Sequence, residues 1–136
     1  MELTRKIAGI FSIPKARTIL GGFSMGGYGV YRIYDYCPDF FTSLAIFSGH
    51  HSMGKTLCGG PDYGTPDKIS LFKDIPMIIF HGSEDRNCPY QEVKNFFDEI
   101  TKVNPNCTIH VQQGEGHSGL TRQWYNKFSK WISIST

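Results

Sequence analysis

Two periodicities of apolar residues alternate along the chain and predict an α/β protein. Apolar side chains recur at helical spacing in four segments: residues 2–12, 26–36, 90–103 and 119–131. Between them lie four short runs typical of β-strands: residues 17–23, 43–48, 76–80 and 107–113. The run at 76–80 is continuously apolar, as expected of a strand buried on both faces, whereas 107–113 alternates and is expected nearer an edge.

The order of these segments predicts the architecture. Alternating helices and strands are typical of a parallel sheet, here of about four strands flanked by helices. The longest irregular segment, residues 49–68, is rich in Gly and Pro, and a short helix is expected at 69–72. A chain of 136 residues can bury a real core, so we expect one domain over residues 1–136.

Composition excludes several classes of function. The formal charge of +2 is nearly neutral and the basic residues are scattered, so no nucleic-acid partner is expected. No apolar run approaches the ~20 residues of a membrane span, and we expect no membrane partner. The N-terminal segment lacks the pattern of a signal peptide, which favours the cytoplasm. No cofactor motif occurs, and none of the cysteines forms a C-x-x-C pair that would suggest zinc: Cys37, Cys58, Cys88 and Cys107.

Candidate chemistry is expected in the loops that follow the strands, because ligands bind beyond the carboxyl ends of a parallel sheet. The first such loop holds Ser24 in Gly22-Phe23-Ser24-Met25-Gly26, a G-x-S-x-G pattern between a strand and a helix. A nucleophile elbow places its serine in a strained turn and needs small neighbours so that adjacent chain can pass closely. The alternatives are an inert serine in a tight turn, or a phosphate loop, whose spacing and lysine are absent.

Two later loops supply the partners that a serine nucleophile needs. Asp85 follows the third strand and is our choice for the acid, although neighbouring Glu84 cannot be separated from it by spacing alone. His117 follows the last strand between glycines. Each could be a simple loop residue, but Ser, acid and His occur in the chain order of an α/β-hydrolase triad.

Several motifs together resemble the α/β-hydrolase superfamily, and most closely the esterase group that includes esterase D-like and feruloyl-esterase-like enzymes. They are the run from Gly22 to Gly29, His81-Gly82-x-x-Asp85 with Cys88-Pro89, Gly116-His117-Ser118, and Phe47-Ser48-Gly49. The resemblance implies a truncated α/β-hydrolase fold that matches the C-terminal half of the usual one. It also implies a serine carboxylesterase that acts on small acyl or aryl esters.

The expected site can be stated residue by residue. Ser24 is the nucleophile, His117 the base and Asp85 the residue that orients it, while the N–H of Met25 is one oxyanion donor. The loop that supplies the second donor in this family is missing from the pattern. Candidates for contact with a substrate are Phe23, His50, His51, Leu57 and Tyr63, although the two histidines are more typical of a surface loop. No metal is expected.

Because the resemblance covers only half of the usual fold, we expect this chain to associate with a partner. Nothing in the sequence can pair with the far side of the strand Thr18–Phe23, and an apolar strand edge favours association. We expect a homodimer through this edge, or a complementary N-terminal chain. The functional alternatives are a peptidase of the same superfamily and an inactive remnant with an assembly or binding role.

Overall fold

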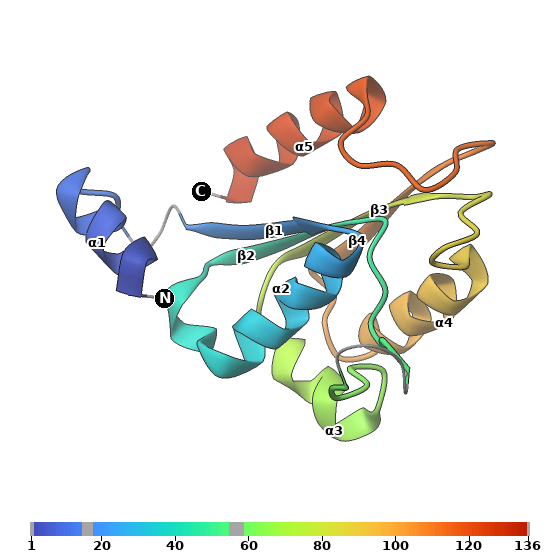
Figure 1. The fold of residues 1–136 in the computed structure, drawn as a ribbon, viewed down its shortest axis with the longest axis horizontal. Helices are drawn as coiled ribbons and strands as arrows, with labels where there is room; N and C mark the ends of the chain where they lie inside the picture. The colour runs from blue at the N-terminus through green and yellow to red at the C-terminus, as the bar shows by residue number, and fades with distance from the viewer. Residues whose placement is uncertain (1, 15–17, 55–58, 136) are drawn as a thin grey trace.

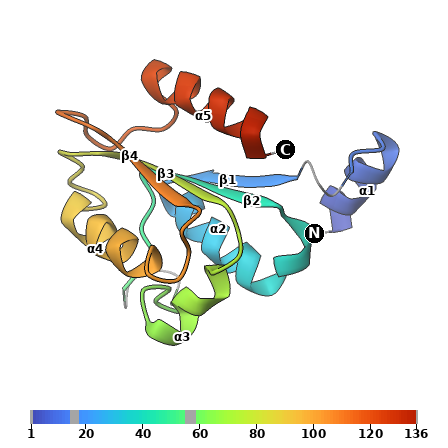
Figure 2. The same cartoon turned by 180° about the vertical axis from the view of Figure 1, so that it is seen from behind.

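A computed structural model describes residues 2–14, 18–54 and 59–135 (Figures 1 and 2). Four parallel strands form one sheet in the order β1-β2-β3-β4: β1 (Ile19–Phe23), β2 (Ser43–Phe47), β3 (Met77–Gly82) and β4 (Cys107–Gln112). The predicted α/β class, parallel sheet and strand number are confirmed.

The helices form a layer on each face of the sheet. On one face lie α2 (Met25–Tyr36), α3 (Pro66–Ile69) and α4 (Tyr90–Ile100), and on the other lies α5 (Arg122–Ser135), as Figures 1 and 2 both show. Two short 3₁₀ turns follow α2 and α3, namely η2 (Pro38–Phe40) and η3 (Ser70–Phe72). The first helix, α1 (Glu2–Ile10), stands apart from these layers (Figure 1).

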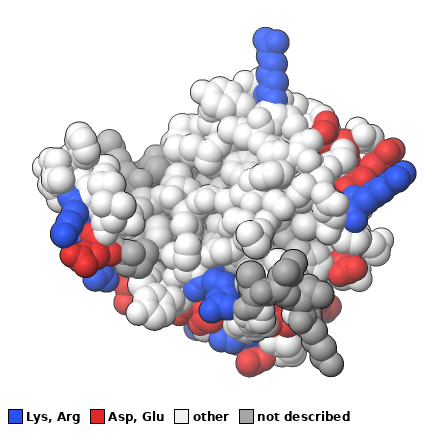
Figure 3. All heavy atoms as spheres, viewed as in Figure 1, with Lys and Arg blue, Asp and Glu red and all other residues white. Residues whose placement is uncertain are grey.

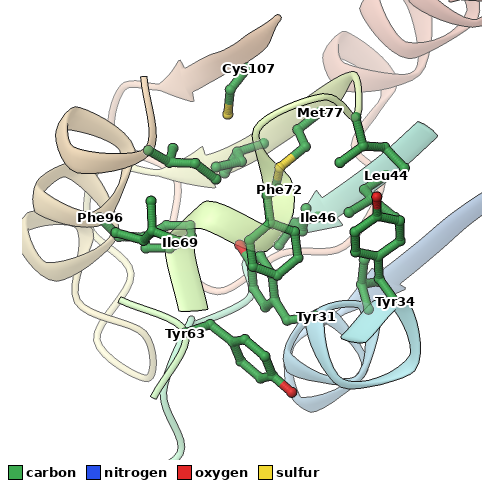
Figure 4. Packing of buried hydrophobic residues seen from close by; sticks show 14 of the residues in the cluster. Tyr31, Tyr34, Leu44, Ile46, Tyr63, Ile69, Phe72, Met77, Phe96 and Cys107 are labelled. Atoms are coloured by element: carbon green, nitrogen blue, oxygen red, sulfur yellow. The ribbon is translucent and has the colours of Figure 1, made fainter. Parts of the chain in front are cut away.

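The larger core lies between the sheet and the α2–α3–α4 layer. Aromatic rings from α2, the loop before α3 and η3 pack there against the aliphatic side chains of β2 and β3 (Figure 4). Tyr31 is central, because its ring contacts those of Tyr63, Phe72 and Phe96. This dense packing fixes α2, and therefore fixes the turn from which α2 starts.

The opposite face has a smaller core under α5. Trp124 is fully buried against Phe80, whose ring stacks on that of Phe47 at 5.1 Å between centroids. Phe128 and Trp131 are half-buried at the border of the cluster, as expected for core-facing residues of the last helix. Because strands β2 and β3 are buried on both faces, they read as continuous apolar runs in the sequence.

Element boundaries differ from the predictions in a few places. The last helix begins at Arg122 and not at residue 119, and the short helix predicted at 69–72 is α3 followed by η3, beginning at Pro66. Helix α4 ends at Ile100 and not at residue 103. Four residues after this end, the side-chain amide of Asn104 donates to the carbonyl oxygens of Phe72 and Ile75. The proline at N1 of α3 explains its early start.

Strand β1 forms one edge of the sheet. The N–H of Ser24 donates to the carbonyl oxygen of Phe47, so the peptide groups of even-numbered residues of β1 face β2. By alternation, those of Ile19, Gly21 and Phe23 face away from the sheet. Figure 1 looks onto this edge, and Figure 3 shows that the same face is largely uncharged, with charged side chains gathered at its periphery.

Candidate active site

Ser24 occupies a strained turn directly between β1 and α2. Its backbone has φ 54° and ψ −121°, in the region that L-residues rarely adopt. The turn is possible because of glycine at position 22, where a Cβ would lie 2.1 Å from the carbonyl oxygen of Gly26. At position 27 a Cβ would lie 2.7 Å from the Cα of Gly49, so glycine lets α2 approach the end of β2. The local geometry is that of a nucleophile elbow.

The imidazole of His117 lies between Ser24 and Asp85. Its Nε2 is 2.7 Å from the Oγ of Ser24, and its Nδ1 is 2.8 Å from the Oδ2 of Asp85. A carboxylate accepts, so Nδ1 carries the proton and Nε2 accepts the hydroxyl proton of Ser24. The structure therefore joins the three predicted side chains in one hydrogen-bonded chain, from three separate loops.

Asp85 is buried at the end of β3. Its Oδ1 accepts from the backbone N–H groups of Asn87 and Cys88, both at 2.9 Å. These two bonds leave Oδ2 free to face His117. Glu84, the alternative acid, is exposed, and its backbone N–H donates to the carbonyl oxygen of Glu115. The geometry thus favours Asp85 over Glu84 as the partner of His117.

Two residues that the sequence motifs contain, but whose role the motifs did not predict, hold the loop of His117 in place. The hydroxyl of buried Ser48 donates to the carbonyl oxygen of Ser118 at 2.7 Å. At Gly82, a Cβ would lie 2.3 Å from the carbonyl oxygens of both Glu115 and Gly116, so only glycine lets this loop cross the end of β3. Ser48 directly follows β2, and this position at a strand end was the signal available in the sequence.

His81 lies behind the acid and is fully buried. Its Nε2 is 2.8 Å from the carbonyl oxygen of Cys88 and 3.5 Å from the Oδ2 of Asp85. Burial lowers the pKa of His81, which favours the neutral ring with its proton on Nε2. In the sequence, His81 stands out only as part of a motif, because a histidine in a strand gives no sign of what its ring will contact.

A pocket of about 520 Å³ opens beside Ser24. Its lining joins the elbow to the loop after β2 and the start of α4: Ser24, Met25, His50, His51, Ser52, Met53, Gly54, Asp62, Asn87, Cys88, Pro89 and Glu92. Both predicted histidines therefore face this space. Phe23 does not line it; its half-exposed ring packs instead against the ring of His117, at 5.0 Å between centroids.

The two histidines of the pocket differ in their surroundings. The Nε2 of His50 is 2.9 Å from the Oε2 of Glu92 on α4. His51 stacks on His50 and on Phe96, with ring centroids 4.3 and 4.7 Å apart. Burial, together with the neighbouring His50, lowers the pKa of His51 to about 4. His51 is therefore a neutral, largely apolar wall of the pocket near neutral pH.

The two further substrate contacts expected from the sequence have different outcomes. Tyr63 is buried in the main core, and its hydroxyl donates to the Oδ2 of Asp35, so the prediction of a substrate contact is wrong (Figure 4). An aromatic ring in a Gly-rich segment gives no sequence sign of whether it turns inward. Leu57 lies outside the described residues.

Among the described residues, Asp85, Cys88 and His117 form a group whose ligand atoms lie within 4.8 Å of one another. Burial raises the pKa of the Cys88 thiol to about 11.

No described helix is long and apolar enough to cross a membrane.

Comparison with known proteins identifies a family for this chain. A family profile described as Phospholipase/Carboxylesterase matches residues 3–135. The chain belongs to the phospholipase/carboxylesterase family. This assignment confirms the resemblance to α/β-hydrolase esterases.

Two curated members resemble the chain in sequence. Acyl-protein thioesterase 1 homolog 2 of Dictyostelium discoideum is 35% identical over 92 residues, which cover 61% of this chain and 35% of the relative. Isoprenylcysteine alpha-carbonyl methylesterase ICME of Arabidopsis thaliana is 30% identical over 107 residues, covering 72% of this chain and 24% of the relative. This phospholipase/carboxylesterase family chain thus spans only about a third or less of these curated relatives.

A solved structure shows the same fold. The crystal structure of a thermostable esterase superposes with a TM-score of 0.78 at 18% identity, over 98% of this chain and 35% of that one. Nearly the whole chain of this family member therefore corresponds to a part of a larger α/β-hydrolase fold.

Proposed function

We propose that the protein is a serine hydrolase that cleaves carboxylic esters through Ser24, His117 and Asp85. The observation that carries the proposal is the pair of hydrogen bonds that His117 makes, at 2.7 Å to Ser24 and 2.8 Å to Asp85. Membership of the phospholipase/carboxylesterase family supports it.

The chemistry follows from the arrangement. His117 Nε2 removes the hydroxyl proton as Ser24 Oγ attacks the acyl carbonyl, and then gives that proton to the leaving alcohol. Asp85 holds the imidazole with Nδ1 protonated and stabilises the imidazolium that forms. Water, activated by His117, then releases the acyl group and restores the free serine.

The first turn of α2 stabilises the negative charge of the tetrahedral intermediate. The N–H of Met25 is at the first position of this helix and has no acceptor among the described residues. A helix N-terminus also carries partial positive charge, which favours an oxyanion. We assign Met25 as one oxyanion donor.

The pocket supports a small acyl or aryl substituent. Its lining includes Met25, Met53 and the neutral ring of His51, and its volume of about 520 Å³ is typical of small-molecule sites. The names of the two curated relatives describe a thioesterase and a methylesterase, so a thioester is included in the proposal beside oxygen esters.

A fluorophosphonate probe tests the nucleophile. We expect covalent labelling of the wild-type chain and none of Ser24→Ala, with Ser133→Ala on the exposed face of α5 as a matched serine control. A folded wild-type sample that does not label would contradict the proposal. A series of p-nitrophenyl esters of increasing acyl length then measures the size of the acyl pocket.

The edge strand β1 supports a partner for this chain. The outward peptide groups of Gly21 and Phe23 can pair with another strand, and the face that carries them is largely uncharged (Figure 3). We propose a homodimer through the edge Thr18–Phe23, with a complementary N-terminal chain as the alternative. Light scattering at micromolar concentration tests the dimer, and a monodisperse monomer would contradict it.

A second function is favoured by this same edge. If the fluorophosphonate probe fails on a folded dimer, the chain acts in assembly or binding, and the triad is a remnant.

We propose the cytoplasm as the location of the protein. Its described free thiols, Cys37, Cys88 and Cys107, fit a reducing compartment.

A further inference from the structure

Three side chains at the site carry atoms that are also metal ligands in proteins. Asp85, Cys88 and His117 offer a carboxylate oxygen, a sulfur and an imidazole nitrogen, all within 4.8 Å of one another. These are the three donor types that zinc uses in proteins. Sequence spacing could not reveal the group, because 32 residues separate the acid from the histidine.

The backbone fixes two of the three donors relative to each other. The N–H of Cys88 donates to the Oδ1 of Asp85, and the carbonyl oxygen of Cys88 accepts from buried His81. The acid and the thiol are therefore held on one tight turn, and His117 reaches them from the loop after β4. On a tetrahedral zinc ion the donors are about 3.4–3.7 Å apart, so a shift of about 1 Å brings these atoms into range.

An ion can reach this group from solvent. Cys88 lines the same pocket as Ser24, which is open at the surface. By contrast, Cys107 is buried in the main core and Cys37 follows the end of α2, so neither belongs to this group. Cys88 is therefore the thiol, among the described residues, that can join a metal to the triad.

We propose that Asp85, Cys88 and His117 form a zinc-binding site that reversibly inhibits the enzyme. The inhibition rests on the proposed hydrolase function, whereas the binding of zinc does not. On binding, the thiol proton leaves to solvent and the sulfur, nitrogen and oxygen each bind the ion, with no change of oxidation state.

Binding of the ion by either nitrogen of His117 inhibits the enzyme. If Nδ1 binds, its proton moves to Nε2, which can then no longer accept the proton of Ser24. If Nε2 binds, its lone pair is occupied directly. In both cases Asp85 is also withdrawn from orienting the imidazole, so the general base is lost.

Binding is tested with Co²⁺, which replaces zinc and reports a thiolate ligand by a charge-transfer absorbance in the near ultraviolet. We expect this band in the wild type and in Ser24→Ala, and its loss in Cys88→Ser, while Cys37→Ser keeps it. Circular dichroism shows that each variant is folded. Absence of the band from the folded wild type, or its survival in Cys88→Ser, would overturn the site, whatever the turnover.

Inhibition is tested by titrating Zn²⁺ into p-nitrophenyl acetate hydrolysis, with each variant compared to its own metal-free rate. Loss of even an outer partner of a metal ligand typically costs about 10–100-fold in affinity, so Cys88→Ser should need at least about tenfold more Zn²⁺ for half inhibition. A chelator should restore the rate, and Mg²⁺, which prefers oxygen ligands, should not inhibit. Equal inhibition of Cys88→Ser and wild type would overturn the proposal.

Discussion

His81 donates a hydrogen bond from Nε2 to the carbonyl oxygen of Cys88, at 2.8 Å, in the interior of the protein. This bond closes the turn whose N–H groups hold Asp85. The acid of the proposed triad is thus held in place by a fully buried histidine.

Removing that bond should reduce turnover through Asp85. In His81→Leu the buried carbonyl oxygen of Cys88 loses its donor, which costs about 1–3 kcal/mol of stability, and we expect kcat to fall while KM changes little. His81→Gln, which keeps an N–H donor, should recover part of both losses. Urea unfolding and ester hydrolysis measure the two effects, and a kcat of His81→Leu equal to that of the wild type would contradict the role.

The identity of the acid can be decided by a matched pair of amide variants. Asp85→Asn can no longer hold His117 in the required tautomer, and we expect a loss of about 10³–10⁴ in kcat, as is typical of such triads. Glu84→Gln, one residue away and exposed, should keep the wild-type rate. The reverse result would make Glu84 the acid.

The elbow makes a sharp prediction about two glycines. Gly22→Ala places a Cβ 2.1 Å from the carbonyl oxygen of Gly26, so the turn must shift and we expect a loss of several kcal/mol or failure to fold. Gly29→Ala lies within α2 with nothing near its Cβ, and should stabilise the helix by about 0.5–1 kcal/mol. Thermal unfolding measures both, and a stable, active Gly22→Ala would contradict the close approach of Gly26 to position 22.

His51 makes stability depend on pH. Its folded pKa of about 4 lies below the unfolded value of 6.5, so the unfolded chain binds the proton more readily between these values. His51 therefore destabilises the fold as pH falls through this window, by up to about 2 kcal/mol at pH 5. His51→Phe, which can keep the stack on Phe96, should lose less stability between pH 7 and pH 5 than the wild type.

Denaturant unfolding at the two pH values gives this difference directly. Because His81 and His110 also have lowered pKa values from burial, the wild type and the variant share a common acid sensitivity. An equal loss in both proteins would mean that His51 is solvated and not buried.

The sequence by itself determined the fold class and which residues could carry the chemistry. Apolar runs such as 76–80 predicted buried parallel strands, because a strand covered on both faces must be apolar throughout. Parallel topology places the loops after β1, β3 and β4 at one edge of the sheet, so Ser24, Asp85 and His117 could be grouped without coordinates.

Only the tertiary structure decided which side chains meet. It separates Asp85 from Glu84, turns Tyr63 into the core, and brings His81 and Cys88 against the acid. These choices depend on side-chain direction and on contacts between distant segments, whereas periodicity reports only which side of an element is apolar. The glycines show the same division: the pattern names Gly22, but the 2.1 Å approach of Gly26 explains why no other residue fits.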